Sequence, residues 1–276
     1  MKSSHQIAFA LGLLALSLMG YDLALSQGEP RTYSNMGADR WEMDEEFPED
    51  SLTFVRLKHR GRKWHTDFPK AETNFTARLQ QLTSIQVSPV FKQLDIDDEG
   101  LFRHPFAFMS NIEGIEFSRA EAENLRKYLS NGGFVMMDDM WGDDMWDDIE
   151  SAMKDVFPDI EPVELDIEHP IFNAVFKLDY LPQVPSHDAA EYWMDRNIDN
   201  HYEIKLRGSP DPDELDEPHY RAWFDQKGRM MMLACHNTDL ADGWEEEDYK
   251  PWFFEKYAEK LCFPMGINIV FYALTH

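Results

Sequence analysis

Acidic side chains and a histidine follow two apolar runs of this sequence, and together they could transfer protons. Asp138 and Asp139 come directly after the run FVMM (residues 134–137). Residues 236–239 (HNTD) come directly after the run MMMLAC (residues 230–235). Carboxylates that lie close together raise one another's pKa, and imidazole titrates near neutral pH. We expect Asp139 or Asp239 to act as a general base and His236 as an acid or a metal ligand. The alternative for both segments is a solvated, hydrogen-bonded loop.

Residues 64–67 (WHTD) form a third polar segment, which follows a strand-like run and precedes a helix. Trp64 or Trp141 could stack on a sugar ring. The alternative is that Thr66 or Asp67 only caps the helix. No cofactor is required by these residues and no metal is identified, although the carboxylates would suit a divalent cation. The predicted ligand-binding residues are Trp64, His65, Asp67, Asn111, Asp138, Trp141, Asn237, Asp242 and Trp244.

Several well-known motifs are absent or incomplete. The glycine patterns of phosphate-binding and dinucleotide-binding loops, the GxSxG turn and the HExxH helix do not occur. Asp95 begins a segment that resembles a calcium loop, but its twelfth position, which must be Glu, is Phe106. Cys235 and His236 are adjacent in an extended run, where neighbouring side chains point to opposite faces. We therefore expect Cys235 to be a small core residue and not a nucleophile.

Strands that alternate with helices are expected to position the polar segments. Ser118 and Glu121 form a capping box at the start of one helix. Residues 220–224 and 230–235 flank a polar turn and predict an antiparallel hairpin. The hydrophobic periodicity predicts strands at residues 52–57, 105–112 and 134–137, and helices at residues 71–82, 119–130, 143–157 and 255–261. Residues 267–274 are apolar enough to form either a helix or a strand, and we favour a helix.

This order of strands and helices predicts an α/β fold with a mostly parallel, mixed sheet. Parallel strands joined by right-handed crossovers carry their following loops to the same edge of the sheet. Asp67 and Asp139 should therefore converge. The loop at His236 could join them, although the strand before it also pairs with an antiparallel strand. The acids at residues 143–148 fit the first turns of a helix, where the helix dipole favours negative charge.

Composition indicates a folded, strongly acidic protein. The chain has 276 residues, 26 Lys and Arg against 52 Asp and Glu, a net charge of −26, and 43% hydrophobic residues. This length can bury a large core in one domain. The negative field repels phosphate backbones and anionic lipids, so we expect no nucleic-acid partner. A neutral polar ligand, a cation or a basic envelope protein is compatible with it.

The N-terminus has the pattern of a signal peptide. Residues 7–20 form an uncharged apolar run too short to span a bilayer, and a small-x-small site precedes Gln27. We expect residues 1–26 to be cleaved near Ser26 and the chain to be periplasmic or secreted, with no membrane insertion afterwards. Residues 27–50 read as an acidic flexible leader and residues 51–276 as the folded domain. Cys235 and Cys262 could form a disulfide or remain two buried thiols.

Ordered motifs from about Leu52 to Thr275 resemble a bacterial family, the domain of unknown function DUF4159. They are residues 64–69 (WHTDFP) with Asn74, residues 132–134 (GGF) leading to Asp138 and Asp139, residues 236–239 (HNTD) with 242–245 (DGWE), and residues 266–268 (GIN).

The resemblance implies a flavodoxin-like three-layer sandwich, similar in fold to class I glutamine amidotransferases. It also implies an exported or membrane-carried bacterial protein whose activity is not established. Glutaminase chemistry is not implied, because Asp138 stands where that family has its nucleophilic Cys. The first functional hypothesis is a site that binds or hydrolyses a neutral polar ligand such as a sugar. The alternative is a non-catalytic interaction domain of a cell-envelope complex.

Overall fold

The computed structural model describes residues 32–34, 41–42, 50–61, 63–194 and 217–276. The predicted signal peptide lies outside these residues, as does most of the predicted leader. Within that leader, strand β1 (Thr32–Ser34) pairs antiparallel with β3 (Val90–Asp95). None of the helices in the described ranges is long and apolar enough to cross a membrane.

A mixed sheet of eight strands organises the described residues, in the order β1-β3-β2-β4-β5-β8-β7-β6. The strands β3, β2, β4, β5 and β8 run parallel to their neighbours in this series, whereas β1, β7 and β6 pair antiparallel. The remaining bounds are β2 (Val55–Lys58), β4 (Phe106–Ser110), β5 (Phe134–Met140), β6 (Val163–Glu164), β7 (His219–Phe224) and β8 (Met230–His236).

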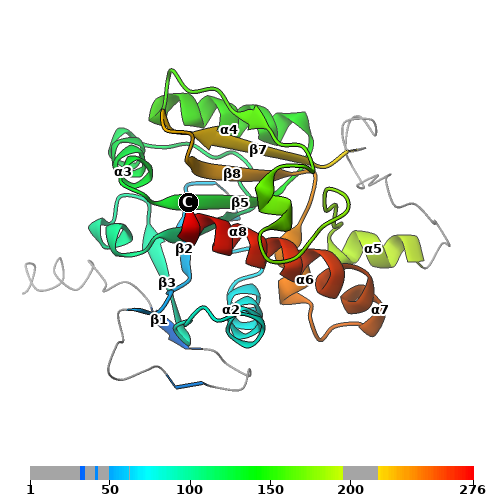
Figure 1. The fold of residues 1–276 in the computed structure, drawn as a ribbon. Coiled ribbons are helices and arrows are strands. Elements are labelled where there is room, and N and C mark those ends of the chain that lie inside the picture. The colour runs from blue at the N-terminus through cyan, green and yellow to red at the C-terminus, as the bar shows by residue number, and fades with distance from the viewer. Residues whose placement is uncertain (1–31, 35–40, 43–49, 62, 195–216) are drawn as a thin grey trace, which may run out of the picture. The chain divides into compact units, whose positions relative to one another are not determined.

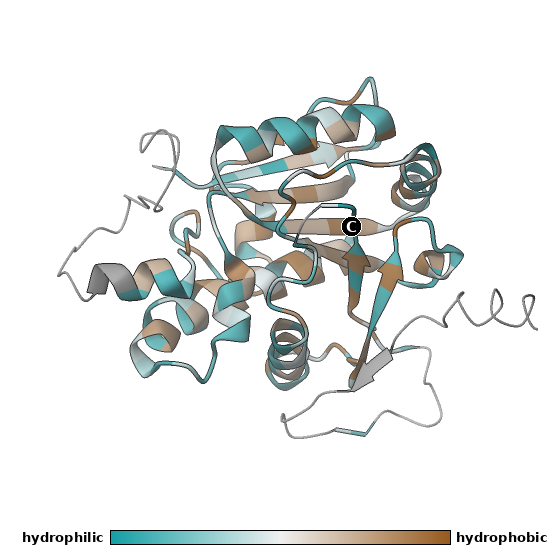
Figure 2. Cartoon of the chain, turned by 180° about the vertical axis from the view of Figure 1, so that it is seen from behind, coloured by the Kyte–Doolittle hydropathy of each residue, from teal (hydrophilic) through white to brown (hydrophobic). Residues whose placement is uncertain are grey.

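Helices cover both faces of this sheet, as Figure 1 shows. On one face, α3 (Arg119–Ser130) and α4 (Gly142–Val156) contribute Leu125 and Ile149 to a buried apolar cluster. On the other face, α2 (Lys70–Leu82), α6 (Leu240–Glu245) and α8 (Phe263–Thr275) build a second cluster. The central strands are therefore apolar on both sides, which Figure 2 shows as brown ribbon. Smaller elements are α5 (His187–Met194), α7 (Pro251–Phe253), a π-helix (Phe254–Cys262) and 3₁₀ turns at Glu99–Arg103 and Pro170–Asn173.

Most of the predicted elements are confirmed. Helix α3 has the predicted bounds and the capping box of Ser118 and Glu121, and β7 and β8 form the predicted hairpin. Residues 267–274 are helical, within the longer α8. Strands β1, β3 and β6 were not predicted. Strand β5 runs three residues further than predicted, because Asp138 and Asp139 continue it as buried residues.

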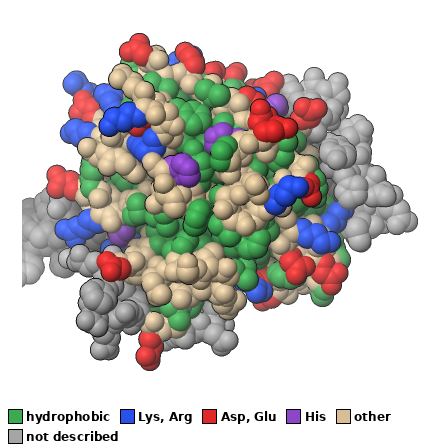
Figure 3. Space-filling view, viewed as in Figure 1, with side chains coloured by type: hydrophobic (Ala, Val, Ile, Leu, Met, Phe, Trp, Pro, Cys, Tyr) green, Lys and Arg blue, Asp and Glu red, His purple; other side chains and the backbone are tan. Residues whose placement is uncertain are grey.

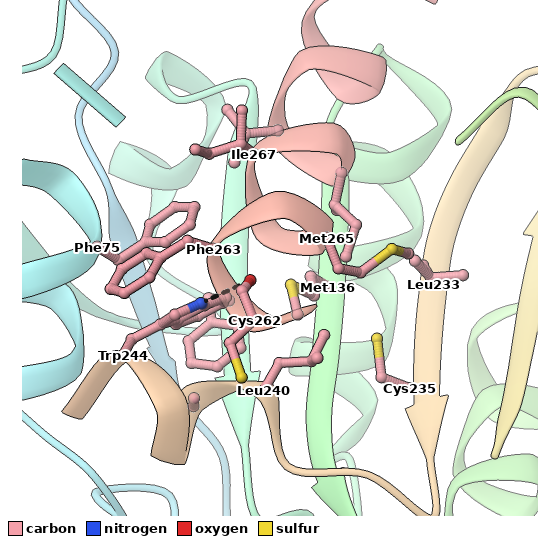
Figure 4. Packing of buried hydrophobic residues seen from close by; sticks show 14 of the residues in the cluster. Phe75, Met136, Leu233, Cys235, Leu240, Trp244, Cys262, Phe263, Met265 and Ile267 are labelled. Carbon is pink, nitrogen blue, oxygen red and sulfur yellow. Dashed lines mark hydrogen bonds between the residues drawn. The ribbon is translucent and has the colours of Figure 1, made fainter. Parts of the chain in front are cut away.

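The core beneath α6 explains several motif residues as packing residues (Figure 4). The Trp244 ring lies 4.3 Å from the Phe75 ring, centroid to centroid, and its Nε1 donates to the Cys262 carbonyl oxygen at 2.9 Å. Cys235 and Cys262 are both buried and free, so no disulfide joins them. Burial raises the pKa of each thiol well above its usual range, which opposes formation of a nucleophilic thiolate.

Candidate functional site

Five aspartates gather at the carboxyl end of the parallel strands. Asp138 and Asp139 lie near the end of β5, Asp239 is the N-cap of α6 and Asp242 lies in its first turn, and Asp67 precedes α2. Each of Asp67, Asp139 and Asp239 is affected electrostatically by at least one other member of this group. We call Asp67, Asp138, Asp139, Asp239 and Asp242 the acidic cluster. The predicted convergence of Asp67, Asp139 and the loop after β8 is thus realised, through the Asp239 end of that loop.

The side of the cluster that carries Asp67 lies where the winding of the sheet reverses, between β2 and β4. The chain passes from β2 to β3 on one side and then to β4 on the other side of β2. Loops that follow the strands on either side of such a reversal diverge and leave room for a ligand in open α/β sheets. Here those loops carry Asp67 after β2 and Asn111 after β4.

Left-handed backbone conformations mark the strand ends at the site. The φ angles are 62° at Asp67, 47° at Asn111, 56° at Asp139 and 57° at Asn237. Asp and Asn enter this region more readily than other residues with a Cβ atom, because their short polar side chains can hydrogen-bond locally. Non-glycine residues in this conformation cluster at functional sites, where the surrounding structure holds them in place.

Asp139 is held in one orientation by two side chains. Asn111 Nδ2 donates to its Oδ2 at 2.8 Å, and Trp141 Nε1 donates to its Oδ1 at 2.9 Å. Asp139 is 5% exposed. Burial raises its pKa, and these two hydrogen bonds oppose that rise because they favour the charged form.

Asp138 and Asp239 are buried more completely and contact the start of α6. Asp138 Oδ2 accepts from the Ala241 amide at 2.8 Å, while its Oδ1 has no hydrogen-bond partner among the described residues. Asp239 caps α6, since its Oδ1 accepts from the Asp242 amide at 3.0 Å. Burial raises the pKa of both aspartates well above the usual range, and neighbouring carboxylates add to the rise.

A buried arginine fixes the loop that carries Asp67. Arg56 Nε lies 2.5 Å from Glu72 Oε1, and both side chains are fully buried. Arg56 Nη1 also donates to the carbonyl oxygens of Trp64 and Thr66, at 3.3 and 3.0 Å. Helix α2 has no side-chain cap, so the structure does not use Asp67 as a helix cap.

Asp67, Asp242 and Glu245 form a subset of the site that could hold a metal ion. One oxygen from each carboxylate lies within 4.8 Å of the other two. The His187 backbone amide donates to Asp242 Oδ2, and the His187 Nδ1 atom lies 3.2 Å from the same oxygen. This contact raises the pKa of His187 to about 9.

Three of the predicted site residues, His236, Asn237 and Trp244, contact residues outside the acidic cluster. The His236 ring stacks between Trp146 and His219, at centroid distances of 5.8 and 5.5 Å, and its nitrogens contact Arg221 Nη1 and the Gly142 carbonyl oxygen. The expectation of an acid or metal ligand at His236 is therefore corrected, because both ring nitrogens are engaged away from the acidic cluster.

Asn237 and Trp244 have structural contacts instead of a free binding surface. Asn237 Oδ1 accepts from the Gly142 amide at 3.0 Å, which ties the loop after β8 to the loop after β5. Trp244 is 1% exposed within the core, so the expectation that it binds a ligand is corrected as well. His65 is exposed and its ring lies against Trp64, which is half-buried beside the site.

Sequence reasoning did not single out His187, Glu245 or Arg56 as site residues. Glu245 belongs to a quoted motif and lies three residues after Asp242, the spacing that places two side chains on one helix face. An arginine inside the apolar strand β2 is also a usable signal, because a buried charge requires a partner. His187 lies in a segment without a clear periodic pattern and had no such signal.

Comparison with known families gives one match. The model of the family described as "Domain of unknown function (DUF4159)" matches residues 53–274, which is most of the chain. No curated protein matches the chain.

Proposed function

The chain belongs to the DUF4159 family, and we propose that its acidic cluster binds a neutral polar ligand, such as a sugar, and hydrolyses it by acid–base chemistry. The observation that carries this proposal is the environment of Asp139. Its carboxyl group is buried, its pKa is raised, and Asn111 and Trp141 hold its two oxygens in place. An oriented carboxylate, kept ionised by two hydrogen bonds but with a pKa raised by burial, is what a general base requires.

The proposed reaction divides the proton transfers between two carboxyl groups. Protonated Asp239, whose pKa is raised well above the usual range, donates its proton to the leaving oxygen as the bond to that oxygen breaks. Asp139, whose ionised form is favoured by the hydrogen bonds from Asn111 and Trp141, takes a proton from the attacking water, whose oxygen forms the new bond. Proton exchange with solvent then restores both groups. A neutral ligand is favoured because an anion would be repelled by the remaining carboxylates.

The order of the parallel strands supports the finer fold assignment that we propose, a flavodoxin-like sandwich related to class I glutamine amidotransferases. Numbered along the chain, the parallel strands β2, β3, β4, β5 and β8 stand in the spatial order 2-1-3-4-5. This is the order of flavodoxin-like sheets. Export to the periplasm or beyond, after cleavage near Ser26, remains part of the proposal and rests on residues 1–26 of the sequence.

The test compares Asp139→Asn with Asp143→Asn, which removes the same charge from an exposed side chain in the first turn of α4 that is not a member of the acidic cluster. A panel of neutral saccharides is screened by calorimetry for binding and by a reducing-end assay for hydrolysis. We expect the Asp139 variant to lose about 100-fold or more in hydrolysis, the usual effect of removing a general base, and the Asp143 variant to retain activity. A wild-type protein that binds no saccharide, or an active Asp139 variant, would contradict the proposal.

An apolar surface along α8 favours the second candidate function, an interaction domain in a cell-envelope complex. Phe271, Leu274 and the nearby Val175 are 36%, 38% and 41% exposed. Figure 3 shows hydrophobic side chains gathered on the face along which α8 runs. For an interaction domain, Leu274→Glu would disrupt the complex and Asp139→Asn would not. If the protein is the proposed hydrolase, Asp139→Asn would lower the hydrolytic activity and Leu274→Glu would not.

A further inference from the structure

We propose that Asp67, Asp242 and Glu245 bind a hard divalent cation of the Ca²⁺ or Mg²⁺ class. The loop after β2 supplies Asp67, and the two other carboxylates come from α6. This inference deepens the proposed function, because the cation would lie beside Asp139 in the same acidic cluster. Cation binding nevertheless can be measured with no other ligand present.

The spacing of the carboxylate oxygens fits a hard cation. The three ligand atoms lie within 4.8 Å of one another. Ca²⁺ binds oxygen at about 2.3–2.6 Å, so two of its ligands are at most about 5 Å apart, whereas Mg²⁺ requires at most about 4.2 Å. The observed spacing accommodates Ca²⁺, whereas Mg²⁺ would require the three oxygens to lie no more than about 4.2 Å apart. Oxygen-only ligands do not favour zinc or copper, which prefer nitrogen and sulfur.

An unpartnered buried oxygen provides independent evidence for a missing ligand. Asp67 Oδ2 is shielded from solvent and has no hydrogen-bond partner among the described residues. Of the neighbouring basic groups, Arg56 contacts Glu72 through Nε, and Lys70 pairs with Asp248 at 2.9 Å. Arg56 Nη2 also has no hydrogen-bond partner among the described residues, so neither basic group donates to Asp67 Oδ2. A buried acceptor without a donor is costly, and a bound cation would remove that cost.

The other two ligands are placed as metal ligands require. Asp242 is oriented by the backbone amide and ring of His187, as ligating carboxylates are commonly held by hydrogen bonds from outside the coordination sphere. Glu245 lies one helical turn after Asp242, which puts both side chains on the same face of α6. Asp242 is buried and Glu245 is half-buried, so Glu245 forms the solvent-facing side of the site.

The experiment uses the whole chain, stripped of metal, and titrates it by calorimetry with CaCl₂ and, separately, with MgCl₂. Glu245→Gln removes one ligand. Glu161→Gln is the matched control, because it removes the same charge from an exposed side chain beside β6, outside the ligand set. We expect saturable binding of one ion, weakened about tenfold or more by Glu245→Gln and changed less than twofold by Glu161→Gln.

Equal weakening by the two variants would overturn the inference, since it would show diffuse attraction to the negative surface. Wild-type protein that binds neither ion below about 10 mM would overturn it as well. If Glu245→Gln lacks the circular dichroism of the native fold, Asp67→Asn takes its place with the same expectation. Cation binding should persist in Asp139→Asn. Loss of hydrolysis with intact cation binding, or the reverse, therefore separates this inference from the proposed function.

Discussion

Asp138 and Asp139 are neighbours in sequence, yet they have different partners. Asp138 accepts from the first turn of α6, whereas the left-handed backbone at Asp139 turns that residue towards Asn111 and Trp141. One carboxyl group thus joins the strand to a helix, and the other is available to the site. At the residue scale, the function depends on backbone conformation as much as on residue type.

His236 provides a prediction about stability and pH. Burial lowers its folded-state pKa from 6.5 to about 4. The unfolded chain therefore takes up a proton near pH 6.5 while the folded protein does not, so His236 contributes stability above pH 6.5 that is lost as the pH falls towards 4. The loss attributable to this residue reaches about 3 kcal/mol.

Urea unfolding at pH 7.5 and pH 4.5 measures this effect. We expect His236→Gln to show a smaller drop in unfolding free energy between these pH values than the wild type. His65→Gln, at an exposed position, should keep the wild-type drop. A drop of equal size in the His236 variant would show that its ring does not control the pH dependence.

At the scale of elements, the short helix α6 serves both the site and the core. Its Asp242 and Glu245 belong to the proposed cation site, and its Trp244 packs on Phe75. A Cβ atom at Gly243 would lie 2.1 Å from Cys262 Sγ, so α6 approaches the π-helix too closely for any larger residue. This close approach fixes how far α6 stands from Asp67.

We expect Gly243→Ala to lower the unfolding free energy by about 1–3 kcal/mol, the usual cost of overpacking a core. Chemical denaturation measures the change. In a Cys262→Ala background the same substitution should cost less, because the sulfur that it meets is gone. An equal cost in both backgrounds would mean that the clash with Cys262 is not the cause.

At the scale of the whole molecule, negative charge is in large excess. The net charge is −26, and many of the ion pairs in the described residues are exposed, such as Arg119 with Glu123. Exposed pairs contribute about 0–1 kcal/mol each, so the mutual repulsion of the acids should outweigh the attraction within these pairs.

Raising NaCl from 50 to 500 mM at pH 8, in the presence of a chelator, should therefore stabilise the protein. We expect an increase of about 2–4 °C in the unfolding midpoint, corresponding to about 1 kcal/mol for a domain of this size. Scanning calorimetry provides the measurement. A midpoint that falls with salt would show that favourable ion pairs outweigh the repulsion.

The sequence by itself determined the elements that have strong local signals. The capping box at Ser118, the apolar strand that begins at Phe134 and the hairpin of β7 and β8 follow from short-range patterns. It also predicted that the loops after parallel strands converge, because right-handed crossovers leave little choice of edge. That rule brought Asp67 and Asp139 together correctly. Strand β3 was missed because its segment alternates polar and apolar residues only in part.

Only the tertiary structure decided which side chains of those loops reach the site. His236 and Asp239 lie three residues apart, but the first stacks on Trp146 and the second meets the acidic cluster. Their directions depend on a left-handed residue, Asn237, whose conformation is stabilised by its contact with Gly142 across the sheet. Long-range contacts of this kind leave no local pattern in the chain. The physical reason is that strand periodicity assigns alternate faces only while the backbone stays extended, and at these strand ends it does not.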